Sequence, residues 1–151
     1  MIRYLSVAAV LAVGATVAYA QVPTGAAAIS ERKAAMKAVG GANKAIQDMN
    51  KGDVPFDAAK AAASFKTMED AFVKAKGLFP DDSMTGGETQ ALPAIWEKKA
   101  DFAASFDKAI AVAKAGAAGS ATEASFKDQV KNVGPSCGGC HKDYRQAPAK
   151  K

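Results

Sequence analysis

Apolar side chains recur three or four positions apart in four separate segments of this 151-residue chain. The segments cover residues 29–46, 61–75, 95–113 and 126–144, and in each the spacing gathers mostly apolar residues on one helical face. Ala, Lys, Asp and Glu are frequent between them, and long runs of β-branched residues are not. This composition favours helices over strands. The sequence therefore predicts an all-α protein, an antiparallel four-helix bundle with polar connections.

Local signals refine the expected helix boundaries. Ser120 and Glu123 have the spacing of a capping box, which predicts the start of the last helix. Pro135, inside that helix, is expected to kink or restart it. Gly40 and Gly41 lie inside the first helix, where each glycine costs about 1 kcal/mol relative to alanine. Such a pair indicates either a close approach of another group or a local kink.

The first twenty residues have the features of an export signal. Arg3 supplies an early positive charge, residues 5–13 form an apolar run, and residues 18–20 end the stretch with the small-x-small pattern of a cleavage site. A membrane anchor is the alternative, but the run is shorter than the roughly 20 apolar residues of a spanning helix. We therefore expect a signal peptide at 1–20, and a periplasmic domain at 21–151 without a membrane span.

Charge argues against one class of partner. The mature chain would carry 19 basic and 15 acidic residues, a net charge of about +4. The lysines are dispersed and few aromatic residues lie between them, so nucleic-acid binding has little support. A mild, scattered excess of this kind is typical of a solvated surface.

Both cysteines and the single histidine stand together as Cys137, Cys140 and His141, in the segment CGGCH. On a helix the two cysteines point the same way, and both fall on the inward face of the last predicted helix. C-x-x-C-H is the attachment signature of c-type haem: the thiols form thioethers to the porphyrin, and the imidazole coordinates iron. We therefore expect one covalently attached haem c, with His141 as an iron ligand.

Three other roles for these cysteines and the histidine fit the sequence less well. A disulfide between Cys137 and Cys140 suits an oxidising compartment, but redox-active pairs of this spacing accompany a βαβ pattern that the sequence lacks. A zinc site needs four ligands and the cluster offers three. An iron–sulfur cluster fails for the same shortage of thiolates.

A sixth iron ligand would come from earlier in the chain, because there is no second histidine. Methionine is the usual donor opposite histidine in electron-transfer haem proteins. The candidates are Met36, Met49, Met68 and Met84. Met36 is preferred, because it lies midway along the first helix, which should neighbour the last one. Arg32 also faces inward one turn earlier, and a buried guanidinium needs a partner that a haem propionate would supply.

The mature chain resembles the class II c-type cytochromes, the cytochrome c′ family, in which a four-helix bundle holds haem on a C-terminal C-x-x-C-H. The resemblance rests on CGGCHKDYR, which ends in Arg145, and on the Arg-x-x-x-Met formed by Arg32 and Met36. Five-coordinate members commonly carry a non-ligating residue such as leucine where Met36 stands. The methionine here is similar to the low-spin branch, cytochrome c556. Arg145, one turn beyond His141, is expected to act on the haem electrostatically.

Two functions stay open at this stage. With His141 and Met36 on opposite faces, the iron would have six ligands and would serve electron transfer with redox partner proteins, not catalysis. In the alternative the iron is five-coordinate, as in cytochrome c′, and binds a gas such as NO or CO. The sequence names no redox partner, and it leaves open a homodimer.

Overall fold

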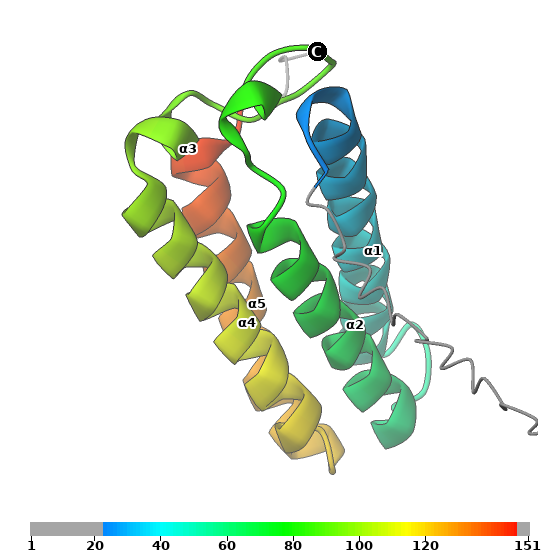
Figure 1. Ribbon diagram of the computed structural model, residues 1–151. Helices are drawn as coiled ribbons and strands as arrows, with labels where there is room; N and C mark the ends of the chain where they lie inside the picture. The colour runs from blue at the N-terminus through cyan, green and yellow to red at the C-terminus, as the bar shows by residue number, and fades with distance from the viewer. Residues whose placement is uncertain (1–22, 148–151) are drawn as a thin grey trace, which may run out of the picture.

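The computed structural model describes residues 23–147, and this part of the chain forms a four-helix bundle (Figure 1). The long helices are α1 (Gly25–Lys51), α2 (Ala58–Lys76), α4 (Lys99–Gly119) and α5 (Glu123–Tyr144). The connection between α2 and α4 contains a short 3-10 helix, η1 (Asp81–Ser83), and one helical turn, α3 (Ala94–Glu97). The predicted bundle is confirmed. The predicted signal peptide lies outside the described residues.

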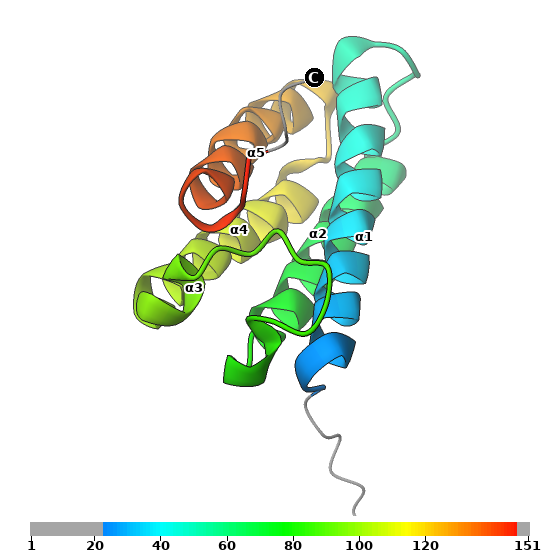
Figure 2. The ribbon, with the colours of Figure 1, turned by 90° about the horizontal axis from the view of Figure 1, so that it is seen from above.

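Consecutive long helices are antiparallel, but the bundle does not close evenly. α1 packs along α2, α2 along α4 and α4 along α5, whereas α1 and α5 meet over only a short stretch. Figure 2 shows α5 leaving α1 as it runs from its orange end to its red end. The start of α1 and the end of α5 therefore lie at the same, wider end of the bundle. No helix among residues 23–147 is long and apolar enough to cross a membrane.

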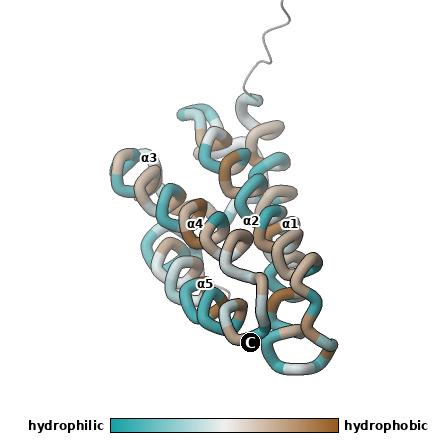
Figure 3. The backbone as a smooth tube through the Cα atoms, turned by 90° about the horizontal axis from the view of Figure 1, so that it is seen from below, coloured by the Kyte–Doolittle hydropathy of each residue, from teal (hydrophilic) through white to brown (hydrophobic). Residues whose placement is uncertain are grey.

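The core follows the apolar stripes that the sequence predicted. Its largest fully buried side chains include Phe65 and Met68 of α2, Ile46 of α1, and Phe126 and Val133 of α5. Figure 3 shows hydrophobic and hydrophilic stretches alternating along each long helix, as expected of helices with one apolar face. The rings of Phe65 and Phe126 meet edge-on, with centroids 6.3 Å apart. Each such buried side chain contributes roughly 1.5–3 kcal/mol through removal of apolar surface from water.

The start of α5 differs from the prediction. Its cap is Thr122, whose hydroxyl accepts from the backbone N–H of Ser125, and the Ser125 hydroxyl accepts in return from the N–H of Thr122. The expected pair of Ser120 and Glu123 is therefore wrong. Ser120 is buried and donates to the carbonyl oxygen of Gly116, 2.6 Å away, so its hydroxyl ends α4 instead of starting α5.

The third expected helix, 95–113, is divided at Lys98, which has φ −123° and ψ 49°. The turn before the break is fixed by Trp96, whose indole N–H donates to the carbonyl oxygen of Pro80, 3.1 Å away. The ring of Trp96 also lies edge-on to Phe79. These contacts hold α3 against the preceding connection, while α4 continues in the direction of the bundle.

Helix-breaking residues have less effect than the sequence suggested. α5 continues through Pro135, so the helix does not restart there, although Pro135 cannot donate a backbone hydrogen bond to Lys131. α1 continues through Gly40 and Gly41, and a Cβ on either would meet no atom within 4 Å. In the described chain no neighbouring helix approaches these two glycines closely, so a helix contact there is wrong, whereas a close approach of the porphyrin stays a prediction.

Gly116 of α4 lies directly against the ring of Phe65 of α2, and we predict that Gly116→Ala is destabilising. An added Cβ would overlap the ring of the fully buried Phe65. Relieving the overlap should lower the free energy of unfolding by about 1–3 kcal/mol, measured by urea denaturation. The matched control is Gly41→Ala, which meets open space and should raise it by about 0.5–1 kcal/mol. Equal effects at the two positions would contradict this account of the α2–α4 contact.

Candidate functional site

The C-x-x-C-H segment occupies the last two turns of α5. Cys137 and Cys140 are half-buried, carry free thiols and pack against the hydrophobic core. Val133, one turn before Cys137, and Tyr144, one turn after Cys140, are buried on the same face. The inward orientation predicted for the two cysteines is therefore confirmed. His141 is exposed on this turn of α5.

The surroundings of these groups set their protonation. Burial raises the pKa of the Cys137 thiol, and burial followed by the negative charge of neighbouring groups raises that of Cys140. Partial desolvation lowers the pKa of His141, and the positive charge of Arg145 lowers it further. Both causes favour the neutral imidazole, in which one ring nitrogen has a lone pair for a metal.

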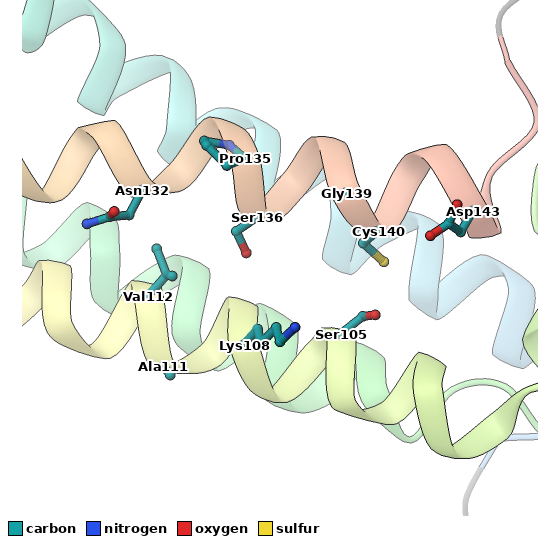
Figure 4. Close-up of a pocket in the computed structure, with 10 residues that line it drawn as sticks. All are labelled: Ser105, Lys108, Ala111, Val112, Asn132, Pro135, Ser136, Gly139, Cys140 and Asp143. Carbon is teal, nitrogen blue, oxygen red and sulfur yellow. The ribbon is translucent and has the colours of Figure 1, made fainter.

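A groove of about 640 Å³ lies between α4 and α5 and includes one of the three motif residues. Figure 4 shows Cys140 pointing from α5 toward Ser105 of α4, with Ser136 beside it and Lys108 across from it. Cys137 and His141 do not line this groove. Cys140 therefore lies on the α4 side of α5.

Met36 lies on α1, partly buried and packed against the core. Met49 is buried on the same helix, 13 residues away, which is about 20 Å along a helix axis. Met68 is enclosed by the core of α2, and Met84 is exposed in the α2–α4 connection. Among these methionines, Met36 alone combines partial burial with a place in the half of α1 that lies toward the wider end of the bundle.

Arg32 is buried, with 4% of its surface exposed, and its guanidinium is occupied by neutral groups. One terminal nitrogen donates to the carbonyl oxygen of Leu78 (3.2 Å) and to Ser83 Oγ (2.8 Å). The other donates to the carbonyl oxygen of Ser83 and to Thr89 Oγ1, both at 2.9 Å. The charge lies 4.7 Å from the ring centroid of Phe79. The pairing of Arg32 with a haem propionate stays a prediction.

Arg145 follows the last turn of α5, where its guanidinium donates from Nε (3.0 Å) and Nη2 (2.7 Å) to Gln90 Oε1. A short antiparallel bridge between Ala91 and Arg145 supports this contact. Sequence reasoning missed Ser83, Thr89 and Gln90 as partners of the two arginines. They lie 51 to 57 residues away, in a polar connection that carries no periodic signal.

The two thiols and the imidazole of the C-x-x-C-H motif fit haem c better than a disulfide, a zinc site or an iron–sulfur cluster. No group of three or more His, Cys, Asp or Glu side chains in residues 23–147 is arranged to hold a metal ion. Two inward thiols one turn apart, beside a neutral imidazole, suit two thioether bonds and one axial iron bond.

Comparison with known proteins gives the same answer. The model of the family described as Cytochrome C′ matches residues 27–145. Cytochrome c′ of Rhodopseudomonas palustris is 40% identical over 144 residues, covering 95% of this chain and 96% of the relative. Cytochrome c-556 of Agrobacterium fabrum is 38% identical over 120 residues, 78% of this chain and 80% of the relative.

A solved structure of Rhodopseudomonas palustris cytochrome c′ matches with a TM-score of 0.76 at 42% identity, covering 82% of this chain and 98% of that one. The bundle, the C-terminal motif and these matches agree over nearly the whole described chain. The chain belongs to the cytochrome c′ family of class II c-type cytochromes, and its cofactor is covalently bound haem c.

Proposed function

We propose that this cytochrome is a periplasmic electron carrier whose haem is joined to Cys137 and Cys140, with its iron held between His141 and Met36. The observation that carries the proposal is the placement of Met36. It is a thioether donor packed against the core, in the half of α1 that lies toward the wider end of the bundle, the end at which α5 carries the motif. In a six-coordinate centre of this kind no position on the iron is free for a substrate, so we assign electron transfer and not catalysis.

The chain's own residues support this function in distinct ways. The half-buried thiols would fix the cofactor to the inner face of α5. The lowered pKa of His141 keeps its imidazole free of a competing proton. Aromatic side chains of α4, Phe102 and Phe106, are buried and would exclude water from the bundle interior. When bound, the haem supplies a one-electron couple that the protein tunes through these surroundings.

The positive charge of Arg145 acts next to the site. This charge lowers the pKa of His141. The guanidinium is therefore close enough to the imidazole to disfavour a second positive charge beside it. We propose that it acts on the haem through this charge, while its hydrogen bonds go to Gln90.

A second function is favoured by one observation. The relative that is 40% identical over almost its whole length is named cytochrome c′, and this name is typical of five-coordinate members. In that case Met36 would not bind iron, and the open face would take NO or CO. The relatives named cytochrome c-556, at 35–38% identity, are consistent with the first proposal.

Replacing Met36 separates the two functions. In the six-coordinate protein, Met36→Leu removes the thioether donor with little change in volume, so we expect loss of the sulfur–iron charge-transfer band and rapid binding of CO by the ferrous protein. Met49→Leu is the matched control, since it makes the same change on the same helix about 20 Å away. Identical spectra for the wild type and Met36→Leu, with CO bound by both, would instead support the five-coordinate function.

Mass spectrometry of the purified protein tests both the covalent attachment of haem and the removal of the signal peptide. Protein matured in a periplasm should begin at Gln21 and carry the added mass of one haem. The double variant Cys137→Ala/Cys140→Ala should lack this added mass and should unfold at a lower temperature, because a group bound only by the native state stabilises that state. An unmodified wild-type polypeptide would contradict covalent attachment, and a retained N-terminal segment would contradict the export signal.

A further inference from the structure

The connection from Leu78 to Leu92, here called the strap, joins the two helices that carry the proposed iron ligands. Figure 2 shows it in green, crossing the wider end of the bundle between α1 and the segment beside the end of α5. At the opposite end α5 is held differently, because Phe126 stacks on Phe56 of the α1–α2 connection with centroids 5.2 Å apart. The strap therefore supplies contacts at the end of the bundle where α5 turns away from α1 (Figure 2).

The strap is fixed to the first turns of α1 by several groups. Arg32 donates four hydrogen bonds to the strap, and Lys33 donates to the carbonyl oxygen of Glu88, 3.3 Å away. Gly87 lies so close to Ile29 that a Cβ there would be 3.3 Å from the Ile29 Cδ1 atom. The contact between strap and α1 is thus continuous over more than one turn of the helix.

One hydroxyl connects this contact to the rest of the strap. Thr89 Oγ1 accepts from Arg32 Nη2 at 2.9 Å and from the backbone N–H of Ala91 at 3.1 Å. The same side chain therefore holds the guanidinium on α1 and orients the segment that leads to α5. A valine at this position would keep the shape and lose both bonds.

Residues 90–92 bind the end of α5 on the other side. The N–H of Leu92 donates to the carbonyl oxygen of Tyr144 (3.1 Å), and the N–H of Gln146 donates to that of Gln90 (2.8 Å). The Gln90 side chain accepts twice from Arg145. A hydrogen-bonded path therefore runs from Arg32 through Thr89 and Gln90 to the last turn of α5.

The two ends of this path lie one turn from the proposed ligands. Met36 follows Arg32 by four residues and shares its face of α1. Arg145 directly follows α5, and its backbone N–H donates to the carbonyl oxygen of His141, 3.2 Å away. Resting on the proposed six-coordinate function, we infer that the strap is a positioning element: it fixes the separation of α1 and α5 and thereby holds Met36 on the iron. Thr89 and Gln90 are the positioning residues of the strap. They affect the bond between Met36 and iron without contacting the iron themselves.

Arg32 suits this role better than a lysine would. It is buried without a carboxylate at ion-pair distance in the described chain, and its charge is balanced by neutral oxygens and by the rings of Phe79 and Trp96, at 4.7 and 5.7 Å. A planar guanidinium can donate to four acceptors in fixed directions, whereas an ammonium cannot. The acceptors and rings that surround Arg32 all belong to the strap or to α3.

The inference is tested in the holoprotein by Thr89→Val and, separately, by Gln90→Ala. Each should weaken the bond between Met36 and iron, which competes with CO for the ferrous site. We expect CO affinity to rise about tenfold, the size typical for loss of one hydrogen bond to a charged group, with a weaker sulfur–iron charge-transfer band. The matched control is Thr85→Val, the same change at an exposed position of the strap. Its CO affinity should equal that of the wild type.

The outcomes distinguish this inference from the proposed function. If Met36→Leu opens the iron while Thr89→Val and Gln90→Ala bind CO like the control, the strap does not position the ligand, and the proposed function stands. If Met36→Leu changes nothing, the six-coordinate function fails and the inference fails with it. Far-UV circular dichroism of each variant, expected to match the wild type, separates a shift in coordination from loss of the fold.

Discussion

The structure depends on one buried cation. Arg32 lies inside the wider end of the bundle with no acidic partner in the described chain, and burial lowers its pKa although it stays charged. Leaving such a group without acceptors would cost several kcal/mol, so the connection between α2 and α4 must wrap around it in one conformation. Leu78, Ser83 and Thr89 supply the acceptors. Because of this requirement, the polar α2–α4 connection is an ordered part of the molecule, although its sequence has no periodic pattern.

The helices and the attachment motif could be read from the sequence, because both are local patterns. The face of α5 that carries Val130, Val133 and Cys137 is defined by a 3.6-residue repeat, and the structure places it inward as expected. The sequence predicted the wrong residue where two neighbouring residues could both cap the same helix. Ser120 and Thr122 both suit a helix cap, and only the burial of Ser120 beneath the end of α4 selects Thr122.

The hydrogen-bond acceptors of Arg32 and Arg145 could not be predicted from such local patterns. Nothing in the sequence of the connection marks Ser83 or Thr89 as an acceptor for Arg32. Their positions depend on how α3 is held by Trp96 and Phe79, which is a tertiary property. The contact of Gln90 with Arg145 likewise joins two segments 55 residues apart. Long-range polar pairing of this kind leaves no periodicity for sequence analysis to detect.

The distance along the chain between Arg32 and its acceptors also has a consequence for the order of folding. These contacts join residues 46 to 57 positions apart, and contacts across such separations form late relative to helix formation. The two thiols of the attachment motif, in contrast, lie within a single helix. Their spacing is therefore set by one turn of α5, before the contacts of Arg32 have closed the connection over α1.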